Sequence, residues 1–418
     1  MLRHWHLTLS LFLLALALRV GYILHTPNPP VFPDAGTSDV IAWNVVSKGL
    51  YLGPDGLPTA YRPPSYVLFL ALIYSVAGHN FTAVRMTQAA LGAILVLILI
   101  SLTRRLCPDP RAGWLAGLMA AVYPFFIYYD SQRISESFLV FWTILSIGLF
   151  LDWKQKPSSL WRASASGAGF AILTLAKTVF IPLFLCLVAI ETVFSFGRRD
   201  GWVRCGRLCV MAVVFALPIF LWGQRNETIF GRFLLDTHGG ATSVECIMFY
   251  PQCKQGIFPE FFKDHPLKKA AEGMNEAEAD AFYLSQTRMW IREHPFRYIR
   301  QMMGNFKNFW RLYPRTDIYF PEGQWKLLLI SLLSEPFLLL TALFGLIRTR
   351  SHWRTLYPVY LLILLFTGIH TLTTGQMRYR LPLMPFAILF SAIYCTSSSA
   401  FATMFARRRR KDPKNASK

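Results

Sequence analysis

The sequence predicts an all-α polytopic protein that crosses a membrane about ten times. Apolar residues make up 54% of the 418 positions and charged residues only 16%, whereas a soluble domain carries more charge. The apolar residues also form long runs, and a helix needs roughly 20 mostly apolar residues to cross the hydrocarbon core. We therefore expect a bundle of transmembrane helices rather than a water-soluble fold.

Most of the apolar runs have the length of a single span. The stretch 163–193 is too long for one passage and is interrupted by Lys177 and Pro182. We interpret it as two short helices that meet at one membrane face. The single runs are 7–24, 82–102, 112–128, 137–151, 208–222, 327–347, 357–371 and 381–404.

Basic loops predict the orientation, because short loops rich in Lys and Arg remain on the cytoplasmic side of a membrane. Placing all of them inside puts both termini in the cytoplasm. It also keeps segment 64–77, apolar but only 14 residues long, on the outer face. The basic loops and the basic tail are 104–111, 154–162, 198–207, 348–354 and 405–418.

The net charge of +20 is then mostly a topology signal. We expect a multi-pass protein of the plasma membrane with membrane lipids as partners and no nucleic acid. Arg19 lies inside the first span. Its favoured interpretation is snorkelling toward the nearer interface, and pairing inside the bundle is the alternative.

This topology divides the chain into four parts. They are an N-terminal transmembrane module at 1–223 with an outer loop at 25–81, an outer-face loop domain at 224–326, C-terminal helices at 327–404 and a cytoplasmic tail at 405–418. Cys246 and Cys253 lie in the outer loop domain. They could form a disulfide in an oxidising compartment, and the sequence leaves this pairing open.

Charged side chains of both signs recur where the predicted outer connections begin and end. Such a cluster suits an anionic lipid headgroup, because cations bind its phosphate and a carboxylate remains for proton transfer. The candidate residues are the acids Asp34, Asp39 and Glu136 and the bases Arg62, Lys177, Arg378 and Arg380.

Each candidate also has a structural interpretation. Asp34 could cap a helix, and Asp39 could be a dipole partner in the first turn of that helix. Glu136 could cap the fourth span. The arginines could be solvated loop charges or membrane-edge anchors. Lys177, beside a helix break, is the hardest to explain by structure alone.

Several short motifs follow one another in a characteristic order. After Asp34 come Ala-x-Asn-x-x-x-x-Gly at 42–49, Pro-Thr-Ala-Tyr-Arg-Pro-Pro-Ser-Tyr at 58–66, Tyr-Pro at 123–124, Ser-Glu at 135–136 and Arg-Tyr-Arg-Leu-Pro at 378–382. Each motif alone is weak, but their order resembles the GT-C class of membrane glycosyltransferases over nearly the whole chain. In particular it is similar to bacterial relatives of dolichyl-phosphate-mannose protein mannosyltransferases and to lipid A aminoarabinose transferases.

The resemblance implies a GT-C-type bundle with interfacial helices and assigns roles to the candidates. An aspartate of the first outer loop is the base, so Asp34 is favoured and Asp39 is the second choice. The Arg62-Pro-Pro unit meets the lipid phosphate, as do the later bases. Glu136 resembles an acid that helps to hold a phosphate-bound metal or the acceptor. Lys177 stands where relatives often have Arg.

The resemblance further implies a reaction in which a sugar moves, with inversion, from a polyprenyl-phosphate donor to a lipid, glycan or protein acceptor at the outer face. It leaves open the sugar, the acceptor and any divalent metal. A transporter or flippase of the same anionic lipids is the main alternative, and a membrane scaffold is a third. Transporters often contain repeated halves with polar residues at mid-membrane, and we find no such repeat.

Overall fold

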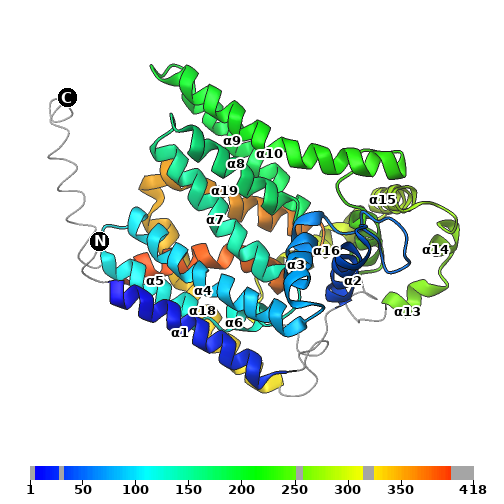
Figure 1. Ribbon diagram of the computed structural model, residues 1–418, viewed down its shortest axis with the longest axis horizontal. Helices are drawn as coiled ribbons and strands as arrows, with labels where there is room; N and C mark the ends of the chain where they lie inside the picture. Colours follow the sequence, from blue (N-terminus) through cyan, green and yellow to red (C-terminus); the bar gives the residue numbers. More distant parts are fainter. Residues whose placement is uncertain (1–4, 28–32, 251–257, 314–323, 397–418) are drawn as a thin grey trace.

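The computed structural model describes residues 5–27, 33–250, 258–313 and 324–396. All regular elements in these ranges are helices, apart from one isolated β-bridge between Leu52 and Pro58. The long helices run side by side as a bundle, and shorter helices gather at one end of it (Figure 1). The predicted all-α, multi-span architecture is confirmed.

Eight helices in the described ranges are long and apolar enough to cross a membrane, or nine if one bent pair counts as a span. The bent pair is α5 (Pro110–Val122) and α6 (Pro124–Asp130), which meet at 52°. The eight are α1 (Trp5–His25), α4 (Phe81–Leu106), α7 (Glu136–Gln155), η2 with α9 (Thr178–Phe180 and Ile181–Ser195), α10 (Gly201–Phe230), α18 (Gln324–Arg348), η4 with α19 (Arg350–His352 and Trp353–Leu372) and Met377–Thr396, which begins with η5 (Met377–Leu383).

The predicted count of about ten exceeds this number because of α8 (Leu160–Thr174). The structure has the expected break near Lys177, whose backbone is extended, with φ −157° and ψ 116°. That break leaves α8 with 15 residues. At 1.5 Å per residue it is only about 22 Å long, shorter than a hydrocarbon core of about 30 Å.

Arg19 is paired inside the bundle, so the favoured interpretation of snorkelling is wrong. Its Nε atom donates to Oδ2 of Asp130 at 2.6 Å, and its other nitrogens donate to carbonyl oxygens of α1 and α5. Gly92 of α4 makes room for the pair, since a side chain there would collide with both partners. The ion pair fixes α1 against the end of α6.

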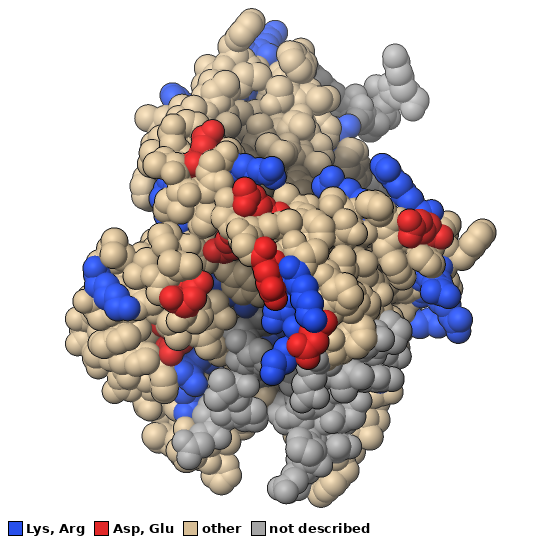
Figure 2. Space-filling model, turned by 90° about the vertical axis from the view of Figure 1, so that its right-hand side faces the viewer, with Lys and Arg blue, Asp and Glu red and all other residues tan. Residues whose placement is uncertain are grey.

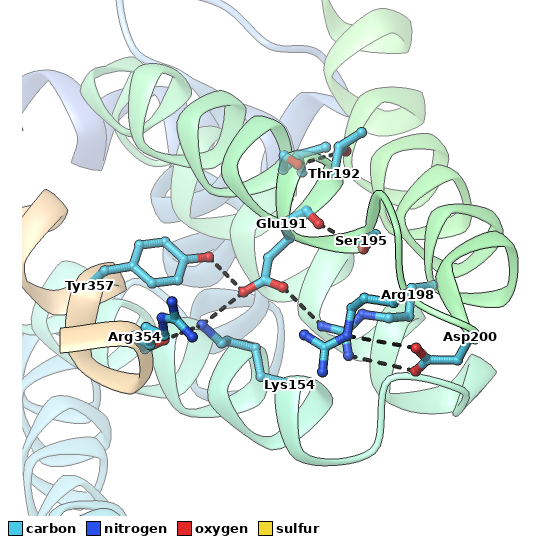
Figure 3. A network of polar contacts seen from close by, with 10 residues as sticks. Lys154, Glu191, Thr192, Ser195, Arg198, Asp200, Arg354 and Tyr357 are labelled. Carbon is cyan, nitrogen blue, oxygen red and sulfur yellow. Dashed lines mark hydrogen bonds and ion pairs between the residues drawn. The ribbon is translucent and has the colours of Figure 1, made fainter. Parts of the chain in front are cut away.

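A second buried charge cluster lies where the predicted cytoplasmic loops meet the bundle (Figure 3). Glu191 of α9 accepts from the Tyr357 hydroxyl at 2.8 Å and from Arg204 at 3.1 Å, and Nζ of Lys154 lies 2.8 Å from the same carboxylate. These residues come from α7, α9, α10 and α19. One carboxylate therefore joins four helices.

The opposite end carries the short helices (Figure 1). They are α2 (Pro33–Lys48), α3 (Pro64–Ala77), α11 (His238–Ser243), η3 (Val244–Met248), α13 (Phe258–Lys263), α14 (Pro266–Ala270), α15 (Glu276–Glu293) and α16 (Pro295–Phe309). In the described ranges, α3 packs against α2 and α4, and α16 packs against α19. Residues 224–326 were predicted to form an outer loop domain. Their described part begins within α10 and lies against the bundle, with no separate domain visible.

Candidate active site

A cavity of about 450 Å³ opens at the end of the bundle that carries α2 and α3. Its wall consists of the ends of several helices and the loops beside them. Figure 2 looks onto this end and shows acidic and basic side chains gathered around a hollow in its middle. The lining residues fall mainly in 61–67, 134–136, 176–182, 236–247 and 369–379.

Four of the predicted residues meet at this cavity although they are far apart in the sequence. Arg62, Glu136 and Lys177 line it directly. Arg378 lies behind Glu136, with its Nε atom 3.7 Å from Oε1 of that acid. Glu136 is buried in the first turn of α7, and Ser135 occupies the N-cap position without a capping hydrogen bond from its side chain. These four side chains are therefore neighbours in the structure, and their role in binding a phosphate stays a prediction.

Tyr379 provides a common surface for two of the bases. Nζ of Lys177 lies 4.1 Å from the centre of the Tyr379 ring, and Cζ of Arg378 lies 4.9 Å from it. Cations are attracted to the faces of aromatic rings. The ring thus holds positive charge at the cavity wall without neutralising it.

The segment that carries Arg62 is held from both sides. Its carbonyl oxygen accepts from the Tyr51 hydroxyl at 2.7 Å, and Arg225 of α10 donates to the carbonyl of Thr59 at 2.7 Å. Glu276, at the start of α15, accepts from the Thr59 hydroxyl at 3.2 Å and also from Thr237. The carboxylate of Glu276 therefore ties two cavity-lining segments together.

The loop before Glu136 is held by α4. Arg85 donates from Nε to the carbonyl of Ser131 at 2.8 Å, and Gln88 donates to the carbonyl of Asp130 at 3.1 Å. Both side chains are almost fully buried. Buried polar groups are rarely left unpaired, and here they are used to fix the backbone that leads into Glu136.

The two candidate aspartates are placed differently. Asp34 begins α2, but its side chain lies outside the described residues, so its role stays a prediction. Asp39 is buried, accepts from the Tyr74 hydroxyl and lies 3.1 Å from Nε2 of His79. It does not line the cavity, although its neighbour Ser38 does. Since α2 already includes Pro33, Asp39 lies beyond the first turn of this helix. The interpretation of Asp39 as a first-turn partner of the helix dipole is therefore wrong.

Arg380 is separated from Arg378. Its guanidinium is buried, pairs with Glu335 and donates to the carbonyl of Arg311 at 2.6 Å. It is not among the residues that line the cavity. Both arginines belong to a 3₁₀ helix, which has three residues per turn. A spacing of two residues therefore points them to different sides.

Two cavity residues were missed from the sequence. Asp236 accepts from the Thr178 hydroxyl at 2.8 Å. Burial raises the pKa of the Asp236 carboxyl above its ordinary value, whereas that hydrogen bond and the charge of Arg62 act in the opposite direction. His370 lies in the last turn of α19 and also lines the cavity. Only its position shortly before the Arg-Tyr-Arg-Leu-Pro motif could have drawn attention to it.

One further prediction, the disulfide, lies partly outside the described ranges. Cys253 does, so its disulfide with Cys246 stays a prediction. Among the described residues, no three His, Cys, Asp or Glu side chains form a group that could hold a metal ion. The question of a divalent metal remains as the sequence left it.

Comparison with known proteins agrees with the resemblance of the motifs. Residues 61–222 match the family model described as dolichyl-phosphate-mannose-protein mannosyltransferase. An undecaprenyl phosphate-alpha-4-amino-4-deoxy-L-arabinose arabinosyl transferase of Pseudomonas fluorescens is 24% identical over 233 residues, which are 54% of this chain and 40% of the relative. The chain thus spans less than half the length of that relative.

Solved structures share the fold. The archaeal oligosaccharyltransferase AglB of Archaeoglobus fulgidus, in complex with an inhibitory peptide and a dolichol-phosphate, superposes with a TM-score of 0.59 at 16% identity, over 99% of this chain and 52% of AglB. A second structure of the Archaeoglobus oligosaccharyltransferase, tethered to an acceptor peptide, gives 0.56 at 16% identity over 99% and 51%. At this identity the likeness concerns the fold.

The resemblance predicted from the motifs is therefore confirmed. Over residues 61–222 the chain is similar to the dolichyl-phosphate-mannose-protein mannosyltransferases, over about half its length it is similar to an aminoarabinose transferase, and its helical bundle has a GT-C-like fold.

Proposed function

We propose that this chain is a GT-C glycosyltransferase that moves a sugar from a polyprenyl-phosphate donor to a lipid, glycan or protein acceptor. One observation carries the proposal. Arg62 and Lys177, which come from separate parts of the chain, line one cavity together with the acid Glu136, and Arg378 lies directly behind that acid. The family match over 61–222 and the undecaprenyl phosphate sugar named for the relative support the same chemistry.

The bases stabilise the leaving group. As the acceptor oxygen bonds to the anomeric carbon of the sugar, the bond from that carbon to the phosphate oxygen breaks, and negative charge grows on the phosphate. Arg62 and Lys177 offset this charge at the cavity wall, and such preorganised stabilisation is usually the largest catalytic contribution. Glu136 holds Arg378 in reach of the same site. Attack from the face opposite the phosphate inverts the anomeric centre.

We assign the acceptor proton to Asp34. Asp39 is the weaker candidate, because its carboxylate already accepts from Tyr74 and faces His79 away from the cavity lining. We therefore assign Asp39 to the packing of α2 on α3. We assign Arg380 a structural role, because its guanidinium forms a buried ion pair with Glu335 outside the cavity lining.

The proposal includes an orientation in the plasma membrane. The cavity end faces outward, both termini and the Lys154–Glu191–Arg204 cluster face the cytoplasm, and residues 224–326 form an outer layer over the cavity. In this arrangement α8 is a short tenth span and α2 and α3 lie in the interface. With 14 residues, α3 reaches about 21 Å and is too short to cross.

The transporter alternative has less support. A transported lipid headgroup needs polar sites near mid-membrane, whereas this cavity lies at one end of the bundle. A volume of about 450 Å³ falls within the roughly 300–1,000 Å³ that is typical of small-molecule sites. It can accommodate a sugar and its phosphate while the polyprenyl chain stays in the membrane.

The test is sugar transfer by the purified full chain in lipid nanodiscs. Short-chain polyprenyl phosphates that carry mannose, glucose or 4-amino-4-deoxy-arabinose serve as donors, with a membrane extract as the source of acceptors. Arg62→Ala should lower the rate at least tenfold, whereas Arg297→Ala, an exposed arginine on α16, should not. Absence of transfer from every donor, together with no binding of polyprenyl phosphate, would refute the proposal.

A further inference from the structure

His370 is a histidine locked against the cavity wall. Only 3% of its surface is exposed, and it lines the cavity. Its ring lies nearly parallel to that of Tyr379, with centroids 5.0 Å apart and an angle of 14°, and to that of Phe309, at 5.5 Å and 25°. These aromatic contacts fix the plane of the imidazole but leave its nitrogen atoms unexplained.

The two ring nitrogens of His370 are poorly satisfied by the protein. Within the described part of the chain, both Nδ1 and Nε2 are buried and lack a partner with full hydrogen-bond geometry, and the backbone of Thr374 is the polar group close enough to interact with the ring. Buried side-chain nitrogens are nearly always satisfied by protein, water or a ligand. A rigid, buried imidazole that borders a cavity therefore points to a ligand group.

The surroundings decide which kind of group this is. Lys177 contacts the same Tyr379 ring on which His370 stacks. A protonated imidazole would place a second buried positive charge near Lys177, which is unfavourable. The neutral ring offers one donor and one acceptor. A sugar hydroxyl can donate to the unprotonated nitrogen or accept from the protonated one, whereas a phosphate offers only acceptors and is better matched by Arg62 and Lys177.

We propose that His370 hydrogen-bonds a hydroxyl of the donor sugar and positions that sugar beside the phosphate. This inference rests on the proposed glycosyltransferase function. In the donor the sugar is bonded directly to the phosphate. Since His370 and Lys177 contact the same Tyr379 ring, we place a sugar bonded to a phosphate at Lys177 beside His370.

The test compares two ligands that differ only in the sugar. Binding of a short-chain polyprenyl phosphate, and of its mannosyl, glucosyl and 4-amino-4-deoxy-arabinosyl esters, is measured for the wild type and for His370→Phe. Phenylalanine keeps the aromatic stack but has no ring nitrogens. We expect His370→Phe to weaken the preferred ester, and its kcat/KM, by about tenfold, as for one lost hydrogen bond. Affinity for the bare phosphate should change by less than about twofold.

His370→Gln is the conservative variant. Its amide offers a donor and an acceptor without the ring, so it should recover part of the ester affinity. A measurement on the wild type avoids any folding defect: the preferred ester should protect His370 from acylation by diethyl pyrocarbonate, whereas the bare polyprenyl phosphate should not.

The outcomes separate this inference from the function on which it rests. If the wild type binds neither the bare phosphate nor any ester, the proposed function fails. If the wild type binds both, four results would overturn the inference alone. His370→Phe could lose affinity for the ester and the bare phosphate equally, lose affinity for neither, or change only the KM of the acceptor. The fourth result is equal protection of His370 from acylation by the two ligands.

Discussion

Replacing Lys177 by methionine tests the charge at the centre of the proposed site. Methionine keeps an unbranched side chain of similar length, so the packing on Tyr379 should persist while the positive charge is lost. Nζ of Lys177 lies 4.1 Å from the centre of that ring and borders the cavity. A phosphate in the cavity would therefore lose a direct cationic partner.

The size of the effect follows from the local environment. Two unit charges about 4 Å apart attract by about 4 kcal/mol at an effective dielectric constant of about 20. Part of that energy is offset by desolvation, and hydrogen bonds to charged groups contribute about 1.5–3 kcal/mol net. Since each 1.4 kcal/mol is a factor of ten, Lys177→Met should lower kcat/KM by roughly 10- to 150-fold.

The assay is transfer from a saturable short-chain donor, together with binding of the bare polyprenyl phosphate. Lys177→Arg is the matched control, because it keeps the charge at the helix break and should retain most activity. Normal transfer by Lys177→Met would refute the phosphate role. A similar loss in both variants, with unchanged phosphate binding, would instead show that Lys177 only stabilises the break.

Four further predictions concern residues around the cavity and the opposite end of the bundle. Asp34→Asn should lower the rate of sugar transfer by roughly 100-fold or more while the donor still binds. Asp39→Asn should lower this rate much less. If Asp39→Asn lowers the rate more than Asp34→Asn does, the base is Asp39. Glu276→Gln should lower kcat/KM about tenfold by loosening the Arg62 segment, and unchanged kinetics would contradict its role as a tie. Burial raises the pKa of the Asp236 carboxyl in the folded protein. Its contribution to stability is therefore present below the unfolded pKa and is lost as pH rises through the folded pKa, so Asp236→Asn should gain stability relative to the wild type as pH rises above the ordinary pKa of an aspartate. Parallel curves of thermal stability against pH for the two proteins would argue against this. Glu191→Gln should destabilise the bundle by about 3 kcal/mol, because it leaves Lys154 and Arg204 buried without the carboxylate that they share. If the variant unfolds in detergent at the same temperature as the wild type, this prediction is wrong.

Much of the fold could be predicted because transmembrane helices are recognisable as long runs of apolar residues. The break near Lys177 was visible as a charge and a proline inside one apolar stretch. The sequence also predicted two short helices there, but it did not show that α8, with 15 residues, is too short to count as a full span. The exact site at which a helix unwinds depends on which backbone groups find other partners, and that information lies in the tertiary packing.

The candidate site was predictable only in part, for a related reason. Charged residues at helix ends could be recognised individually. The motif order grouped Arg62, Glu136 and Arg378, and the helix break drew attention to Lys177. The partner of Arg19 lies 111 residues away, and nothing local in the sequence connects the two. His370 also has no charge or spacing that distinguishes it, so its role emerges only from the rings that enclose it.

The arrangement of charges explains how the site can exist before a donor binds. A cluster of cations at a membrane edge would repel itself, and burying it without partners would be costly. Here Arg378 is held by Glu136, and Lys177 is held by the face of Tyr379. An aromatic face attracts a cation without removing its charge, so the contact with Tyr379 positions Lys177 at the cavity wall. The helix break that carries Lys177 thus combines two functions: it ends α8, and it places a cation beside the proposed leaving group.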